Sequence, residues 1–94
     1  NGMSPLHVAT STGQYGMAKF LIAEGADVNA KDCYISTPLH HASSKGNKRI
    51  TKLLIESGAE INAKGEGERT PIKCALEDGY EDVANLLRKH GAEE

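Results

Sequence analysis

The sequence predicts an all-α solenoid, in which helix–turn–helix units stack side by side, because several phrases recur at one fixed interval. Ser4-Pro5-Leu6-His7 returns 33 residues later as Thr37-Pro38-Leu39-His40, and after 33 more as Thr70-Pro71-Ile72-Lys73. An ungapped period of this length is typical of repeats that stack into a linear array. The same interval separates three further sets of residues, which are Ala9, Ala42 and Ala75, then Gly13, Gly46 and Gly79, and then Gly25, Gly58 and Gly91.

The recurring phrase has the chemistry of a helix start. A Ser or Thr hydroxyl can accept a hydrogen bond from a free backbone N–H of the first turn. Proline suits the first helical position, because the N–H that it lacks would have no intrahelical partner. The glycine that follows can end the helix in a left-handed conformation without a Cβ clash. We therefore expect first helices over about Pro5–Thr12, Pro38–Lys45 and Pro71–Asp78.

A second helix in each unit is predicted by apolar residues that are spaced three and four positions apart. These helices are expected over about Tyr15–Ala23, Lys48–Ser57 and Glu81–His90. The residues expected to be buried between neighbours on both sides are Leu39, Ala42, Leu53 and Leu54. The core candidates of the other units are Leu6, Val8, Ala9, Met17, Phe20 and Leu21 in the first, and Val83, Leu86 and Leu87 in the third.

The composition agrees with a thin stacked array. The 94 residues include one Phe, three Tyr and no Trp, whereas a globular core needs bulky anchors. Single repeats cannot bury their apolar faces, and about three are needed for stability. We expect one domain over residues 1–94, divided into repeats 1–32, 33–65 and 66–94.

With this period and its Thr-Pro-Leu-His-x-Ala phrase, the chain resembles the ankyrin-repeat family over nearly its full length. The resemblance implies helix pairs joined by hairpin loops. Family repeats usually carry Gly in the hairpin before the Thr-Pro. Gly2 fits that pattern, but Ile35 and Glu68 replace the other two glycines, and Gly67 lies one position earlier. The displaced glycine predicts a changed turn in the third hairpin.

The third repeat departs from the family pattern in a second way. Lys73 stands where the family phrase has His, and Arg88 stands where the other repeats have Ile22 and Ile55. A terminal repeat has no neighbour on its outer side, so polar replacements there keep it soluble. We therefore interpret the third repeat as a C-terminal cap.

Composition also limits where the protein works. There is no apolar run of about 18 residues, so no transmembrane helix and no membrane contact are expected. The first residues lack the charged and apolar regions of a signal peptide. Cys33 and Cys74 do not suggest a disulfide framework. We expect an intracellular protein in a reducing setting, in the cytoplasm, with the nucleus as the alternative.

The net charge of −2 is distributed unevenly, with −1 in residues 1–32, +3 in 33–65 and −4 in 66–94. A basic middle beside an acidic end makes no continuous basic stripe, so nucleic acid is not the expected partner. The densest positive cluster is interpreted either as a solvated helix face or as a contact for an acidic protein. It comprises Lys45, Lys48, Arg49 and Lys52.

No motif predicts catalysis, a cofactor or a metal. His7 and His40 occupy the same repeat position, and in the family the matching His hydrogen-bonds locally and ties neighbouring turns together. The two Cys and four His match no zinc spacing. No nucleophile-elbow, zincin or P-loop phrase is present. We therefore expect no enzymatic activity and no bound cofactor.

The resemblance implies a protein–protein interaction module, expected to be monomeric, that binds another protein through a concave surface of hairpin tips and first helices. The alternative is a scaffold segment of a larger enzyme or receptor whose chemistry lies outside this chain. Tyr34 is the expected anchor, because Tyr combines a large contact area with little rotamer entropy. The family's surface positions also include Asn1, Glu66 and Gly67 in the hairpins. The residues predicted to bind the partner are Met3, Ser11, Thr12, Cys33, Tyr34, Ser36, Ser44, Lys45, Arg69, Glu77 and Asp78.

The resemblance also suggests a modification. Asn29 and Asn62 each follow a Leu eight residues earlier and an acidic residue two residues earlier. Ankyrin proteins with this local pattern can be hydroxylated on that Asn, although the side chain more often only braces the loop. Both roles stay open from the sequence.

Overall fold

The computed structural model describes residues 2–94, so Asn1, which the sequence places in the first hairpin, lies outside the described residues. Those residues form six α-helices and one 3₁₀ turn, η1, and contain no strand. The all-α prediction is therefore confirmed. The elements are α1 (Pro5–Ser11), α2 (Tyr15–Ala23), α3 (Pro38–Ser44), α4 (Lys48–Glu56), η1 (Glu66–Glu68), α5 (Pro71–Glu77) and α6 (Glu81–Lys89).

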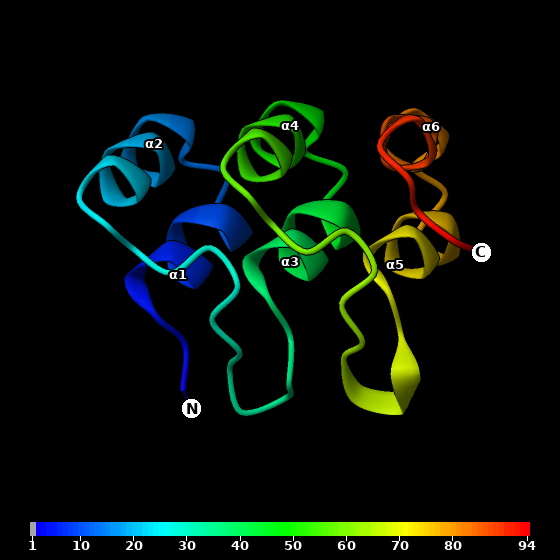
Figure 1. The fold of residues 1–94 in the computed structure, drawn as a ribbon, viewed down its shortest axis with the longest axis horizontal. Helices are drawn as coiled ribbons and strands as arrows, with labels where there is room; N and C mark the ends of the chain where they lie inside the picture. The colour runs from blue at the N-terminus through cyan, green and yellow to red at the C-terminus, as the bar shows by residue number, and fades with distance from the viewer. Residues whose placement is uncertain (1) are drawn as a thin grey trace.

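The helices form two layers. The first helices α1, α3 and α5 make one row, the second helices α2, α4 and α6 make the other, and the hairpins project from the first row (Figure 1). Each helix packs against its partner in the same repeat and against the equivalent helix of an adjacent repeat. The stack measures 31 × 24 × 20 Å.

Helices begin at the predicted residues, and the first-helix phrase shows why. The Ser4 hydroxyl accepts the His7 N–H at 3.2 Å, and the His7 ring accepts the Ser4 N–H at 3.1 Å. Thr37 and His40 repeat this reciprocal cap. Thr70 makes no such cap, and its Oγ1 has no hydrogen-bond partner among the described residues.

Five of the six helices end one residue before the approximate ends expected from the sequence. Thr12, Lys45 and Asp78 follow the last helical residue of α1, α3 and α5 instead of belonging to those helices. In α4 and α6 the last helical residue likewise lies one position earlier than expected. Each of these end residues still donates its backbone N–H to carbonyls of the helix, so it completes the last turn.

The central layer is buried as predicted, with one correction. Leu39, Ala42 and Leu54 are fully buried, as are Ile50 and Thr51. Leu53, which was expected in the same layer, is only half-buried and packs against the edge of the core. The period of a helix places Leu53 and Leu54 about 100° apart, so only one of them can point at the centre of the stack.

Three apolar residues of the first repeat are exposed, contrary to the prediction. Val8, Met17 and Phe20 are 46%, 48% and 58% exposed. In the second repeat, His41 and Ile50 are equivalent to Val8 and Met17, and both face the first repeat. His41 contacts Asp32 in the hairpin that precedes it, and Ile50 is fully buried. Among residues 2–94 nothing lies on that side of the first repeat, so these positions have no neighbour to cover them.

Neighbouring repeats are also joined through their loops. Asn29 donates its amide to the Gly58 carbonyl at 3.2 Å and accepts the Glu60 N–H at 2.7 Å. Asn62 makes the same pair of bonds one repeat later, to Gly91 and Glu93. Both Asn side chains therefore brace the loops, as the sequence suggested, and hydroxylation stays a prediction.

Candidate functional site

Two closed hairpins form the candidate site. The Asp32 N–H donates to the Ser36 carbonyl at 3.0 Å, and the Gly65 N–H donates to the Arg69 carbonyl at 2.7 Å. The hairpins are thus in register with the 33-residue period. Ile35 is the left-handed residue of the second hairpin, whereas the third hairpin has two, Gly67 with a φ of 67° and Glu68. The predicted change of turn therefore occurs, but the register of the hairpin is unchanged.

A groove of about 240 Å³ lies between these hairpins. It brings together three of the eleven residues that the sequence predicted for partner binding, namely Tyr34, Ser36 and Arg69. Gly65 leaves room in the groove, because a Cβ there would lie 3.2 Å from the His40 ring. The other lining residues are Asp32, His40, His41, Glu66 and Cys74.

Tyr34 stands at the rim of this groove and is 61% exposed. Its backbone N–H is held at 2.9 Å by the Asp32 carboxylate, so an exposed ring sits on a fixed backbone. On the opposite wall the Arg69 guanidinium pairs with the carboxylate of Glu77, another predicted residue. That pair is about half exposed on both sides, so it orients Arg69 more than it stabilises the fold.

His40 forms the floor of the groove and links two repeats. Its Nδ1 accepts the Thr37 N–H at 3.0 Å, and its Nε2 lies 2.8 Å from the Arg69 carbonyl oxygen. An amide can only donate and a carbonyl can only accept, so the ring is the neutral tautomer with its proton on Nε2. Burial lowers the pKa of His40, which favours that neutral form. His7 repeats the arrangement with the Ser36 carbonyl.

A second polar contact, which the sequence did not predict, lies beneath the hairpin. His41 Nε2 lies 2.9 Å from Asp32 Oδ2, while Asp32 Oδ1 accepts the N–H groups of Tyr34 and Ser36. Burial acts to raise the pKa of Asp32, but these donors together hold that pKa below its ordinary value. Gly65 occupies the equivalent position of the next repeat, so no recurrence marked Asp32. The available signal was the tendency of Asp to accept an N–H two residues on.

Asp32, His41 and His7 also lie close enough to be considered for a metal ion, with ligand atoms within 4.8 Å of one another. Both ring nitrogens of His7 are already hydrogen-bonded, to Ser4 and to the Ser36 carbonyl. Both carboxylate oxygens of Asp32 are likewise occupied. An ion would have to displace these bonds, so the contacts favour a hydrogen-bonded support for the hairpin.

The remaining predicted residues lie around the groove instead of lining it. Cys33 and Lys45 are exposed, one beside Tyr34 and one at the end of α3. The Ser44 hydroxyl contacts the buried thiol of Cys74, whose pKa is raised by burial. The others are Met3, Ser11 and Thr12 in the first repeat and Asp78 at the end of α5.

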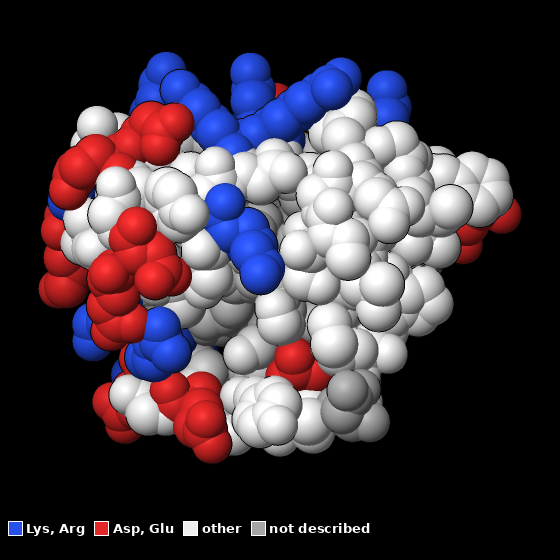
Figure 2. All heavy atoms as spheres, turned by 180° about the vertical axis from the view of Figure 1, so that it is seen from behind, with Lys and Arg blue, Asp and Glu red and all other residues white. Residues whose placement is uncertain are grey.

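Charge is segregated over the molecule. Acidic side chains gather over the C-terminal repeat, and a row of Lys and Arg side chains follows the edge formed by the second helices (Figure 2). On the first-helix side, the matching positions Lys45 and Asp78 carry opposite charges in successive repeats. The surface beside the groove therefore changes sign along the stack.

Family models account for the whole chain. A model described as ankyrin repeats in three copies matches residues 32–94, and a model of a single ankyrin repeat matches residues 1–33. The chain belongs to the ankyrin-repeat family. In this ankyrin-repeat chain, no helix of residues 2–94 is long and apolar enough to cross a membrane.

Individual relatives match about one repeat. Delta-latroinsectotoxin-Lt1a of Latrodectus tredecimguttatus is 61% identical over 31 residues, which are 33% of this chain and 3% of the toxin. Palmitoyltransferase akr1 is 63% identical in Emericella nidulans and 60% in Aspergillus oryzae, each over 30 residues, which are 32% of this chain and 4% of that protein. The chain therefore spans only a small part of these relatives, and the similarity concerns the repeat unit.

Proposed function

We propose that this ankyrin-repeat chain binds another protein through the surface formed by its hairpins and first helices. One observation carries the proposal: the exposed Tyr34 ring lies beside a polar groove, on a hairpin that Asp32 fixes from below. An aromatic side chain on a fixed backbone offers a large contact area and loses little entropy when it binds. Ankyrin repeats as a class are protein-interaction modules, which agrees with this use of the surface.

The charge pattern defines the chemistry of the partner. Lys45 is exposed at the end of α3, whereas Glu77 and Asp78 are exposed at the end of α5. Glu77 is partly neutralised by Arg69, so Asp78 is the freer of the two carboxylates. Complementary charges set the rate and register of association. We infer a partner segment with acidic residues opposite the second repeat and basic residues opposite the third.

The test is binding kinetics on a partner captured by the full-length protein. Tyr34→Ala should mainly speed dissociation, with a cost of about 1–3 kcal/mol if Tyr34 is a hot spot. Lys45→Glu should slow association and reduce its dependence on salt, because it removes a steering charge. Lys19→Glu reverses the charge of another exposed lysine, on α2, and is the matched control that should leave both rates unchanged. Surface plasmon resonance measures all three variants.

Thermal stability is the second readout, because neither Tyr34 nor Lys45 is buried. Both variants should unfold at the wild-type temperature. The proposal fails if both bind as wild type while substitutions at Lys48, Arg49 and Lys52 abolish binding, since the second helices would then carry recognition.

An alternative proposal is that the chain is a scaffold segment of a larger enzyme or receptor. The observation that favours it is the apolar end face of the first repeat, where Val8, Met17 and Phe20 are all about half exposed. Exposed apolar patches commonly mark a surface that another element covers. Hydrogen exchange of α2 in the full-length protein decides: protection beyond that of residues 1–94 alone supports the alternative.

We further propose that residues 1–94 form one non-catalytic, monomeric domain whose third repeat is a C-terminal cap. The cap is supported by Arg88, which stands at an otherwise apolar position and pairs with Glu94 at 2.7 Å and Glu81 at 3.6 Å. Lys73 is likewise exposed.

Cys33 and Cys74 are both free thiols, which suits a reducing intracellular compartment.

A further inference from the structure

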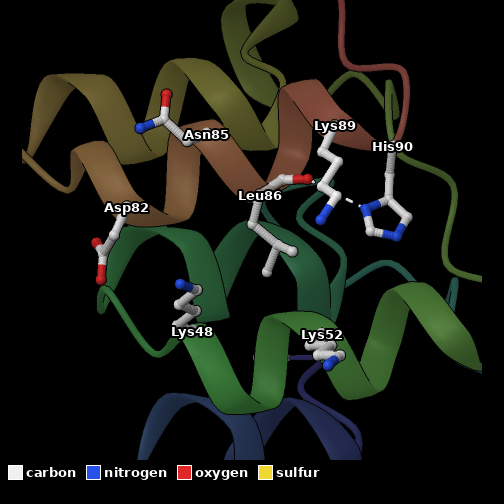
Figure 3. Close-up of a pocket in the computed structure, with 7 residues that line it drawn as sticks. All are labelled: Lys48, Lys52, Asp82, Asn85, Leu86, Lys89 and His90. Carbon is white, nitrogen blue, oxygen red and sulfur yellow. Dashed lines mark hydrogen bonds between the residues drawn. The ribbon is translucent and has the colours of Figure 1, made fainter.

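We propose that a second surface, the groove between α4 and α6, binds an acidic segment of another protein that carries an apolar side chain between its carboxylates. The groove lies in the second-helix layer, on the side of the molecule away from the hairpins, and has a volume of about 540 Å³ (Figures 1 and 3). Its lining residues are Lys48, Lys52, Asp82, Asn85, Leu86, Lys89 and His90.

The two helices supply charge from opposite walls. Lys48 and Lys52 stand four residues apart on α4, so they project from successive turns of one face. Lys89 ends α6, and the exposed His90 ring follows it, with Nδ1 3.1 Å from the Leu86 carbonyl oxygen. The half-buried Leu86 side chain points between these walls (Figure 3). The groove is therefore apolar at its centre and basic at its edges.

Lys48, Lys52 and Lys89 form no ion pair within the described part of the chain. The acidic lining residue, Asp82, accepts the Val83 N–H at 2.9 Å and lies at the end of the groove near Lys48 (Figure 3). Like charges that face each other across a concave surface raise the local concentration of anions. The opposite end, around Lys52 and Lys89, is thus the stronger anion site.

The shape favours a protein segment over a flat anionic surface. A volume of this size is within the range of about 300–1,000 Å³ that is typical of ligand pockets, and it accepts a side chain between the two helices. Amphipathic segments commonly lay an apolar residue into such a groove. Carboxylates on either side of that residue would then meet Lys52 from α4 and Lys89 from α6. This recognition does not use Tyr34 or the hairpins.

The probe is a fluorescent peptide with one leucine flanked by glutamates, titrated with the 94-residue protein at low salt and followed by anisotropy. The combined change Lys52→Gln and Lys89→Gln should weaken binding by about tenfold, which corresponds to about 1.4 kcal/mol. Lys31→Gln with Lys64→Gln removes two exposed charges from the loops and should bind as wild type. Tyr34→Ala should also bind as wild type, which separates this site from the proposed hairpin surface.

Two altered peptides test the two parts of the recognition. Replacing the glutamates with glutamine should abolish binding, and replacing the leucine with serine should weaken it about tenfold. The proposal is overturned if the serine peptide binds as well as the leucine peptide, if the two lysine pairs weaken binding equally, or if no peptide binds. Unchanged thermal unfolding of the Lys52→Gln, Lys89→Gln variant confirms that its fold is intact.

Two other occupants are outcomes of the same experiment. If vesicles containing phosphatidylserine bind the wild type but not the double variant, and the peptide does not bind, the surface is a lipid site and the proposal is wrong. If sedimentation shows wild-type self-association that the double variant lacks, the occupant is the acidic third repeat of a second copy, which also overturns it. Binding of the peptide to a wild-type monomer supports the proposal.

Discussion

Ile35 and Glu68 hold left-handed backbone conformations, with φ angles of 62° and 63°. A residue with a Cβ pays roughly 1–2 kcal/mol for this region, and a branched side chain such as Ile is a marked outlier there. The hairpin bonds of Asp32 to Ser36 and of Gly65 to Arg69 hold both residues in place. The left-handed conformation that glycine usually adopts at this position of the family is thus kept here by Ile35 and Glu68.

Ile35→Gly should raise the free energy of unfolding by about 1 kcal/mol, because relief of the left-handed strain exceeds the entropy that glycine adds to the unfolded chain. Glu68→Gly should act in the same direction. Cys33→Gly, in the same hairpin but at a residue without a positive φ, is the control and should lower stability. Urea unfolding of the three variants measures the differences. A lower midpoint for Ile35→Gly would show that the hairpin stores no strain.

His40 makes stability depend on pH, because its neutral ring is bonded on both sides and burial lowers its pKa below 6.5. The stabilisation is complete above the unfolded value and is lost as pH falls through the lower pKa of the folded state. The urea midpoint should therefore fall between about pH 7.5 and about pH 5.5. In His40→Gln the midpoint should be lower at both pH values but should fall less between them.

His90→Gln is the matched control for this experiment, because it makes the same substitution at an exposed histidine. An equal fall in His40→Gln and in the wild type would assign the pH dependence to other groups.

At the scale of the helix, adjacent apolar residues differ in how deeply they are buried. Leu54 of α4 is fully buried, whereas Leu53 is half-buried at the core's edge. Leu86 of α6, which stands at the position of Leu53 one repeat on, lines the groove toward α4. This position of the second helix therefore faces the gap to the preceding helix and not the centre of the stack.

Leu54→Ala should cost about 2–5 kcal/mol, because it leaves a cavity in a packed layer. That is a large share of a total stability of about 5–15 kcal/mol. Leu53→Ala should cost less, about 1–2 kcal/mol, since part of that side chain already faces water. Midpoints of urea unfolding compare the two. Equal losses would contradict the layer assignment, and an unchanged midpoint in Leu54→Ala would reject it.

The whole molecule is held together by contacts between adjacent repeats. Within the described chain α5 packs on α3 and α6 packs on α4, while the first and third repeats make no comparable helix contact. The His40 and Asn62 bonds join the second repeat to the third. Stability in such an array is approximately a sum of repeat and interface contributions.

Removal of residues 66–94 should therefore abolish cooperative unfolding, because two repeats bury too little surface to fold alone. Far-ultraviolet circular dichroism of residues 1–65 should show mostly unfolded chain, and its urea titration should show no sigmoidal transition. Lys73→Ala in the full chain is the control, since this exposed side chain contributes to the third repeat's surface and not to its packing. A truncated chain that unfolds at the wild-type midpoint would show that the third repeat does not stabilise the others.

The recurring phrases and the apolar spacing between them determined the family fold, the starts of all six helices and the burial of Leu39 and Leu54. These features depend on local chemistry and on a period that the sequence displays directly. The sequence also identified Tyr34 as an exposed hairpin residue, because hairpin positions follow from the repeat frame.

Only the tertiary structure decided which side of each repeat has a neighbour. For this reason Phe20 is exposed, although Leu53 and Leu86, at the same position of the following repeats, are half-buried. It also decided the Asp32–His41 contact and the groove between α4 and α6. A repeat pattern specifies which residues are equivalent, but burial and charge depend on what lies opposite them. That is set by the direction of stacking and by side chains that do not recur.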